Sequence, residues 1–263
     1  MGMHGSEVLM RRAFVFMSLF AMVAMLAPMA AEAAPVVRYT PSELILGQQV
    51  QIALEGAPAR VGDDVVLQEK ISGSWRRIQR KMIRSDGGAT FWERPDTFGI
   101  HWYRIVVPAD GRQGSLVGHG QPIPVRRWRF LSDLDPAATG GPAGTPTAGP
   151  VVINDRTFSR SLRYSAAAQP STTDWTLPAR CVEFRSVLGL ASGSDPGSEV
   201  ELSLYLDGVE QDLDWAQPTM GVGDENAVSG IELVGRTTLR LEHTETVAEA
   251  SPAFGNARIL CAS

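Results

Sequence analysis

Apolar and polar residues alternate along most of the chain in short runs that end at glycine-containing turns. In QQVQIALEG, Val50, Ile52 and Leu54 alternate with polar or small residues, and EVELSLYLDG at 199–208 repeats the pattern before an Asp-Gly turn. A period of two residues is typical of strands with one buried face, and Asp-Gly favours a tight hairpin turn. The first half of the chain carries no apolar stripe at helical spacing over three turns, and the second half demands no helix. The pattern therefore predicts an all-β protein.

The segment 34–131 reads as one small β-sandwich. DVVLQEKISGSWRRIQ predicts a hairpin that turns at Ser72-Gly73-Ser74, and FGIHWYRIVV predicts a closing strand. Together with LGQQVQIALEG and DGGATFWERPDT, these segments resemble the immunoglobulin-like and fibronectin-like domains of bacterial secreted proteins. The resemblance implies an Ig-like β-sandwich that acts as a spacer or presentation module.

The segment 132–150 has the composition of a linker. Its stretch ATGGPAGTPTAGP contains no charge and no large apolar side chain, and it includes Pro142, Pro146 and Pro150. Such a composition buries too little apolar surface to fold, and a long structureless run inside one compact domain is uncommon. We therefore expect a Pro/Gly linker that separates a first unit from a second unit at 151–263.

Charge is split between the two predicted units. The net charge is +5 over 34–131 and −10 over 132–263, which favours two independent units. The basic run Arg76, Arg77, Arg80, Lys81 and Arg84 would point to both faces of a strand rather than form one patch. A charged strand edge is therefore favoured over a nucleic-acid partner.

The segment 151–263 predicts about eight short strands, which suits a jelly-roll sandwich. DWTLPARCVEFRSVLGL, SEVELSLYLDG, VSGIELVGRTTLRLEHT and FGNARIL, in this order, resemble the NPCBM carbohydrate-binding module found beside bacterial glycoside hydrolases. The resemblance implies a galactose-binding-like jelly roll. The chain departs from the family pattern at 189–191 (Gly-Leu-Ala) and 254–256 (Phe-Gly-Asn), which bears on the sugar site more than on the fold.

The N-terminal segment and the two cysteines point to export. Residues 1–33 combine Arg11 and Arg12, a long apolar run and a small-x-small site, as in a secretory signal peptide; an uncleaved anchor is the alternative. No second long apolar run follows, so we expect no membrane span after cleavage. Cys181 and Cys261 are expected to pair in an oxidising compartment, with two buried free thiols as the alternative. Pairing requires the strands that carry them to be adjacent.

The candidate chemistry lies on one acidic loop of the second unit. Asp207, Asp212 and Asp214 could supply oxygens to a structural calcium ion, although the spacing matches no standard calcium loop, and solvated carboxylates are the alternative. Tyr205 and Trp215 could be platforms on which sugar rings pack, or they could fill the core or a loop base.

Catalytic motifs are absent from the sequence. A Ser-His-Asp set could be drawn with His243 and Asp214, but no Gly-x-Ser-x-Gly elbow, Gly-rich phosphate loop or metal-binding His pair occurs. We therefore expect no enzymatic activity.

These observations together predict a secreted or cell-envelope bacterial protein that binds a polysaccharide or cell-wall glycan without catalysis. The alternative is an envelope-associated structural or protein-interaction module without sugar binding.

Overall fold

The structure, a computed structural model, describes residues 35–57, 60–109, 111, 114–165, 170–213, 219–247 and 250–262. The signal peptide predicted at 1–33 and the site residues Asp214 and Trp215 lie outside these ranges. The described chain is built from β-strands with short 3-10 turns and contains no α-helix, which confirms the predicted all-β class. No helix in the described ranges is long and apolar enough to cross a membrane.

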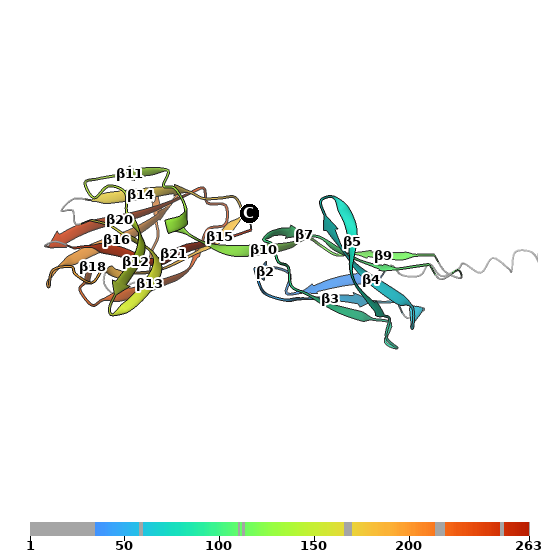
Figure 1. The fold of residues 1–263 in the computed structure, drawn as a ribbon. Helices are drawn as coiled ribbons and strands as arrows, with labels where there is room; N and C mark the ends of the chain where they lie inside the picture. The colour runs from blue at the N-terminus through green and yellow to red at the C-terminus, as the bar shows by residue number, and fades with distance from the viewer. Residues whose placement is uncertain are drawn as a thin grey trace, which may run out of the picture.

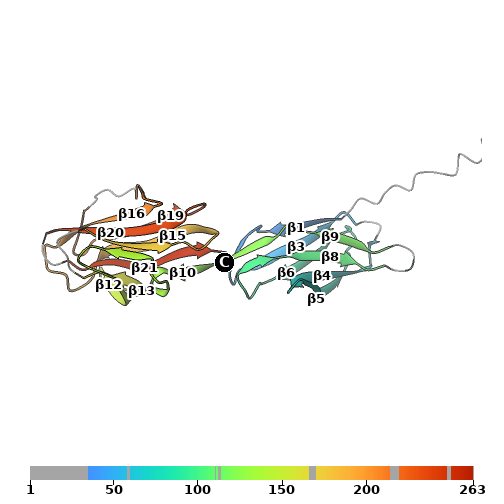
Figure 2. The same ribbon diagram turned by 90° about the horizontal axis from the view of Figure 1, so that it is seen from above.

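The first unit contains a three-stranded and a four-stranded sheet (Figures 1 and 2), and one apolar core lies within this unit. One sheet has the order β1-β3-β6, formed by Val36–Thr40, Val50–Glu55 and Ala89–Glu93. The other has the order β5-β4-β8-β9, formed by Ser74–Met82, Asp64–Ile71, Tyr103–Val107 and Leu116–His119. Alternate residues of both sheets fill the core, as the period of two predicted for β3 requires; they include Val50, Ile52, Leu54, Leu67, Phe91 and Ile105.

One strand, β10 (Ile123–Phe130), belongs to both units. Its first residues pair with β7 (Gly99–His101) and with the short strand β2 (Leu44–Ile45). Residues 127–130 pair instead with β21 (Pro252–Cys261), the last strand of the second unit. Figure 1 shows β10 running from one group of strands to the other. The two units therefore meet through a continuous strand.

The prediction of a structureless linker at 132–150 is wrong. After a 3-10 turn at Leu131–Asp133, β11 (Ala138–Gly140) pairs with β14 (Ser171–Thr176), and β12 (Thr147–Ile153) pairs with β13 (Arg156–Arg163). Small side chains permit this close pairing: a Cβ added at Gly141 would lie 2.2 Å from the carbonyl oxygen of Pro170. Backbone pairing, together with the packing of Leu134 and Ala143 against the second core, orders these residues as part of the second unit.

The second unit also encloses a core between two sheets. One contains β12, β13, β21, β15 (Cys181–Leu190) and β19 (Glu225–Glu232), with β10 added beside β21. The other has the order β11-β14-β20-β16-β17, where β20 is Thr238–Val247, β16 is Glu199–Leu206 and β17 is Val209–Glu210; β18 (Thr219–Gly221) also pairs with β16. The buried residues come from both sheets, and the largest are Tyr164, Trp175, Phe184 and Phe254.

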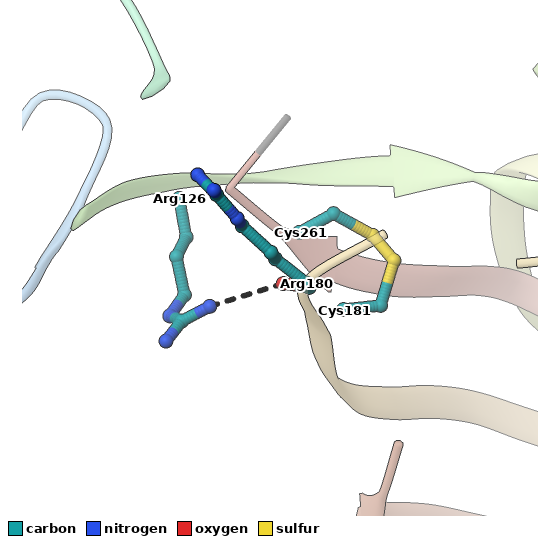
Figure 3. Close-up of a disulfide and its surroundings, with 4 residues drawn as sticks. All are labelled: Arg126, Arg180, Cys181 and Cys261. Atoms are coloured by element: carbon teal, nitrogen blue, oxygen red, sulfur yellow. Dashed lines mark hydrogen bonds between the residues drawn. A yellow bond between two sulfur atoms is a disulfide. The ribbon is translucent and has the colours of Figure 1, made fainter. Parts of the chain in front are cut away.

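A disulfide joins Cys181 and Cys261, with an S–S distance of 1.99 Å (Figure 3). The two cysteines are directly opposed in the antiparallel pair β15·β21, which confirms both the predicted pairing and the strand adjacency. Arg126 of β10 lies beside the bridge. Its Nη1 donates to the carbonyl oxygen of Arg180 at 3.1 Å, and its Nη2 donates to Glu43 of the first unit at 2.9 Å. Arg126 therefore links the two units at their junction, whereas the disulfide joins two strands of the second unit.

Candidate functional site

The candidate site lies on the outer face of the sheet that contains β16. Val200, Leu202, Leu204 and Leu206 of this strand are buried in the core, so the residues between them point outward. These are Glu201, Ser203 and Tyr205. The alternation that predicted the strand thus also determines which of its side chains can meet a ligand.

Neighbouring strands extend this face with polar side chains. On β20, Arg240 and Glu242 stand opposite Tyr205 and Ser203. Arg240 Nε donates to Asp174 Oδ1 of β14 at 2.7 Å, and its Nη2 donates to Asp174 Oδ2 at 3.2 Å. Such a two-point pair fixes both side chains in one geometry. The result is an ordered polar surface across three strands.

Tyr205 is surrounded by carboxylates on this face. Glu242 lies on the adjacent strand β20. Glu210 of β17 is the direct cross-strand partner of Tyr205. Burial and the negative charges of these two glutamates raise the pKa of Tyr205. The phenol O–H can donate a hydrogen bond, while its half-buried ring offers an apolar surface.

A groove of about 410 Å³ is lined by Glu210, the cross-strand partner of Tyr205, and by Ser203, two residues before Tyr205 on β16. Its walls are formed by Glu201, Leu202 and Ser203 of β16 and by the segment 210–213 that follows the hairpin. Ser203 Oγ donates to Glu210 Oε1 at 2.8 Å, and the Gln211 backbone N–H donates to the carbonyl oxygen of Leu204 at 2.8 Å. These bonds hold the segment against the strand. The structure therefore brings Asp212, which lines the groove, to the same corner of the sheet as Tyr205.

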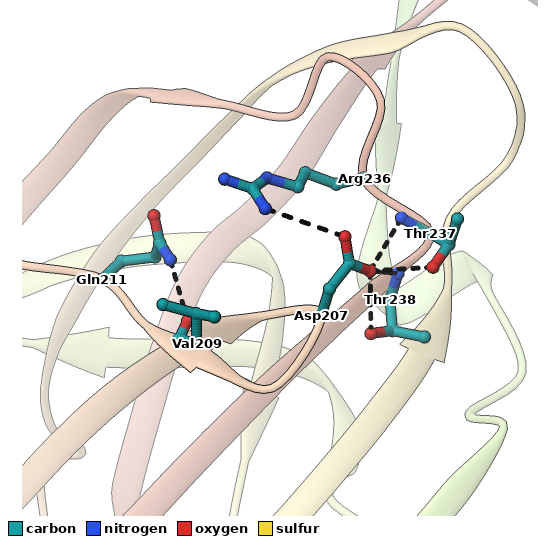
Figure 4. A network of polar contacts seen from close by, with 6 residues as sticks. All are labelled: Asp207, Val209, Gln211, Arg236, Thr237 and Thr238. Carbon is teal, nitrogen blue, oxygen red and sulfur yellow. Dashed lines mark hydrogen bonds and ion pairs between the residues drawn. The ribbon is translucent and has the colours of Figure 1, made fainter.

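Asp207 anchors the hairpin turn that follows β16 (Figure 4). It occupies the hairpin turn with a φ of 51°, and its Oδ1 accepts hydrogen bonds from the backbone N–H and the hydroxyl of both Thr237 and Thr238, at 2.8–3.3 Å. Hydrogen bonds from Thr237 and Thr238 lower the pKa of Asp207 to about 2. With one oxygen already accepting four donors and the other 3.9 Å from Arg236 Nη1, this carboxylate anchors the turn to the loop before β20.

The structure does not test the predicted calcium site in the acidic loop after β16. Asp214 and Trp215, two of the predicted site residues, lie outside the described ranges. Among the residues that the structure does describe, no group of three or more His, Cys, Asp or Glu side chains could hold a metal ion. The calcium ion therefore stays a prediction that depends on the 214–218 segment.

His243 lies inside the second core rather than at a surface. Its side chain is 1% exposed, and neither ring nitrogen has a hydrogen-bond partner among the described residues. The Tyr164 ring lies 4.5 Å away, measured between ring centroids. Burial lowers the pKa of His243 to about 4. A neutral, enclosed imidazole of this kind cannot reach a substrate that approaches from solvent.

Sequence reasoning missed the contribution of β20 and β14 to the face. The signal was present in TTLRLEHT, where Arg240 and Glu242 alternate with the buried Leu239 and Leu241. The pairing of Arg240 with Asp174 left no such signal, because the two residues are 66 positions apart in the chain.

A second hollow, of about 630 Å³, lies where the two units meet. It is lined by Glu43, Leu44 and Ile45 of the first unit, by Arg126, and by residues of β15, β19 and β21. Its main polar groups are already engaged. Arg126 binds Glu43 and a backbone carbonyl, and Glu183 Oε1 accepts from Arg185 Nε and the Gly230 backbone N–H. We therefore assign this hollow a structural role at the junction.

No protein-family model matches the chain, and no curated protein matches its sequence. Solved structures with some likeness include a xylan-binding module, CBM15 (9% identity, 52% of this chain and 96% of that chain, TM-score 0.27). Others are a chicken TCR (10% identity, 78% and 85%, TM-score 0.30) and allantoicase from Saccharomyces cerevisiae (8% identity, 81% and 76%, TM-score 0.28). At these TM-scores the likenesses assign neither a fold family nor a ligand to this chain.

Proposed function

We propose that the protein is an exported, non-catalytic glycan-binding protein, in which the second unit binds a polysaccharide or cell-wall glycan. The observation that carries the proposal is the position of Tyr205 on an ordered polar face, where its cross-strand partner Glu210 lines a groove together with Glu201, Ser203 and Asp212. Sugar rings present an apolar C–H face and a rim of hydroxyl groups. An aromatic ring next to carboxylate and hydroxyl oxygens matches both features.

The proposal of binding without catalysis is supported by the state of the reactive groups. His243 is enclosed in the core, and Asp207 holds a turn through four accepted hydrogen bonds. Neither is placed to transfer a proton to a bound ligand. The disulfide between Cys181 and Cys261 fits an oxidising compartment, which agrees with export.

A glycan array probed with the full exported chain and with the Tyr205→Ala variant tests the proposal. We expect the wild type to bind at least one plant, host or bacterial glycan. Truncation of a central aromatic side chain commonly costs more than about 1.4 kcal/mol, so Tyr205→Ala should weaken that binding roughly tenfold or more. Val222→Ala, which removes an exposed apolar side chain before β19, serves as the matched control.

Two further arms separate the rival hypotheses. Repeating the array with a chelator shows whether a calcium ion contributes. Binding to no glycan, together with capture of a specific envelope protein that Tyr205→Ala abolishes, would establish the protein-interaction role instead. Release of reducing sugar from a bound glycan would show that the protein is an enzyme.

A further inference from the structure

The first unit exposes a tryptophan on a rigid strand. Trp92 of β6 is 48% exposed, because the buried Phe91 before it takes the core position. Its backbone is fixed on both sides: Gln51 of β3 is its cross-strand partner, and its carbonyl oxygen accepts a hydrogen bond from Gln79 Nε2 at 2.6 Å. The indole is therefore presented to solvent from an ordered position, which reduces the entropy lost on binding.

A groove of about 310 Å³ lies on the same sheet face. Gln51, the partner of Trp92, lines it, and so does Thr90, two residues before Trp92 on the same strand. Directly opposed residues of antiparallel strands have Cβ atoms about 5 Å apart, and alternate residues of one strand lie about 7 Å apart. The exposed indole therefore stands at the end of this groove.

The charges of the groove are balanced by ion pairs. Arg38 Nε contacts Glu55 Oε2 at 2.8 Å, and Arg84 Nη2 contacts Asp86 Oδ2 at 3.2 Å. A hydrogen bond from the Gly88 backbone N–H, with Arg84 close by, lowers the pKa of Asp86, so its carboxylate stays an acceptor. The Gln51 side-chain amide, by contrast, makes no hydrogen bond to any residue in the described part of the chain.

We propose that this face of the β1-β3-β6 sheet is a second glycan site, which binds a neutral pyranose oligosaccharide. The indole of Trp92 packs on the C–H face of one sugar ring. The amide of Gln51 and the oxygens of Glu55 and Asp86 bind hydroxyl groups of the rings that follow along the groove. A neutral ligand is favoured over an acidic one because each arginine at the groove already has a carboxylate partner.

This site makes the first unit more than a spacer. The inference does not depend on Tyr205 or on any residue of the second unit, because it is argued from residues of the first unit alone. The chain would then carry two separate sugar-binding faces.

Titration calorimetry with the full chain tests the inference, using cellohexaose, xylohexaose, mannohexaose and chitohexaose as probes. Trp92→Ala should weaken binding at one site at least tenfold, whereas Trp92→Tyr, which keeps an aromatic ring, should retain most of it. Gln51→Ala should weaken the same site. Trp102→Ala is the matched control, since Trp102 is also exposed (43%) but lies outside the groove. Circular dichroism confirms that each variant is folded.

The outcomes separate this inference from the proposed function. Loss of one binding site in Trp92→Ala, with the other site lost in Tyr205→Ala, supports both. If only Trp92→Ala weakens sugar binding, the result supports the site at Trp92 and contradicts the site at Tyr205. Wild-type binding by Trp92→Ala overturns the inference, and so does the absence of binding to all four sugars by the wild type. A change in self-association of Trp92→Ala without any sugar binding also overturns it, in favour of a protein contact.

Discussion

At the scale of single residues, carboxylates that look alike in the sequence have different roles because their partners differ. Asp207 and Asp212 belong to one acidic loop. Asp207 is engaged by Thr237 and Thr238, 30 and 31 positions further along the chain, whereas Asp212 lines the groove. Nothing near Asp207 in the sequence signals this contact. The loop could therefore be singled out from the sequence, but the division of roles within it could not.

His243 makes the stability of the second unit depend on pH. Its pKa is about 4 in the folded chain and about 6.5 when unfolded, so the unfolded chain takes up a proton first as the pH falls. The contribution of the neutral His243 to the free energy of unfolding should be fully present above about pH 6.5 and should be lost as the pH falls from about 6.5 to about 4. We expect His243→Gln to show a smaller loss in melting temperature than the wild type between pH 7 and pH 4.5. Equal losses in the two proteins would show that the histidine does not titrate in this way.

At the scale of strands, alternation predicted where strands form but not how they pair. β3 and β16 were expected from Val50, Ile52 and Leu54 and from the repeat at 199–208, and both are present. β11 and the first half of β12 were missed because residues 138–140 and 147–150 carry no apolar alternation; only the end of β12 does, where Val151 and Ile153 are buried. These strands are ordered by backbone hydrogen bonds to β14 and β13, which leave no trace in side-chain composition.

The disulfide is expected to stabilise the second unit mainly by reducing the conformational entropy of the unfolded chain. It closes a loop across a sequence separation of 80 residues. In the chain-entropy model a loop of this length is worth up to about 4.5 kcal/mol. The double variant Cys181→Ala/Cys261→Ala should therefore lose up to this amount in urea unfolding of the second unit. An unchanged urea midpoint would contradict the account.

The second unit should need β10 for its stability, even though the first residues of this strand pair with β2 and β7 of the first unit. Residues 127–130 cover the edge of β21, where Leu260 is buried. A fragment that begins at Gly120 should therefore unfold at a higher urea concentration than one that begins at Ser132. Equal midpoints for the two fragments would place the boundary after β10, where composition alone put it.

At the scale of the whole molecule, two β-sandwiches share β10, and Arg126 of this strand hydrogen-bonds to both units at their junction. The contrast in charge that first divided the chain remains, with an excess of positive charge before residue 132 and of negative charge after it. Each unit presents a polar sheet face with one aromatic side chain, Tyr205 or Trp92. The all-β class, the disulfide and the position of Tyr205 on a strand could be predicted from the sequence. The shared strand could not, because no local pattern records which sheet a strand joins.

The central claim is that the outer face around Tyr205 binds a glycan. Amide chemical-shift mapping of the isotope-labelled full chain, titrated with a glycan that the array identifies, tests this claim most directly. We predict shift changes that cluster in β16, in the segment 210–213 and around Arg240 and Glu242 of β20. Saturable binding that leaves all of these amides unmoved would contradict the claim.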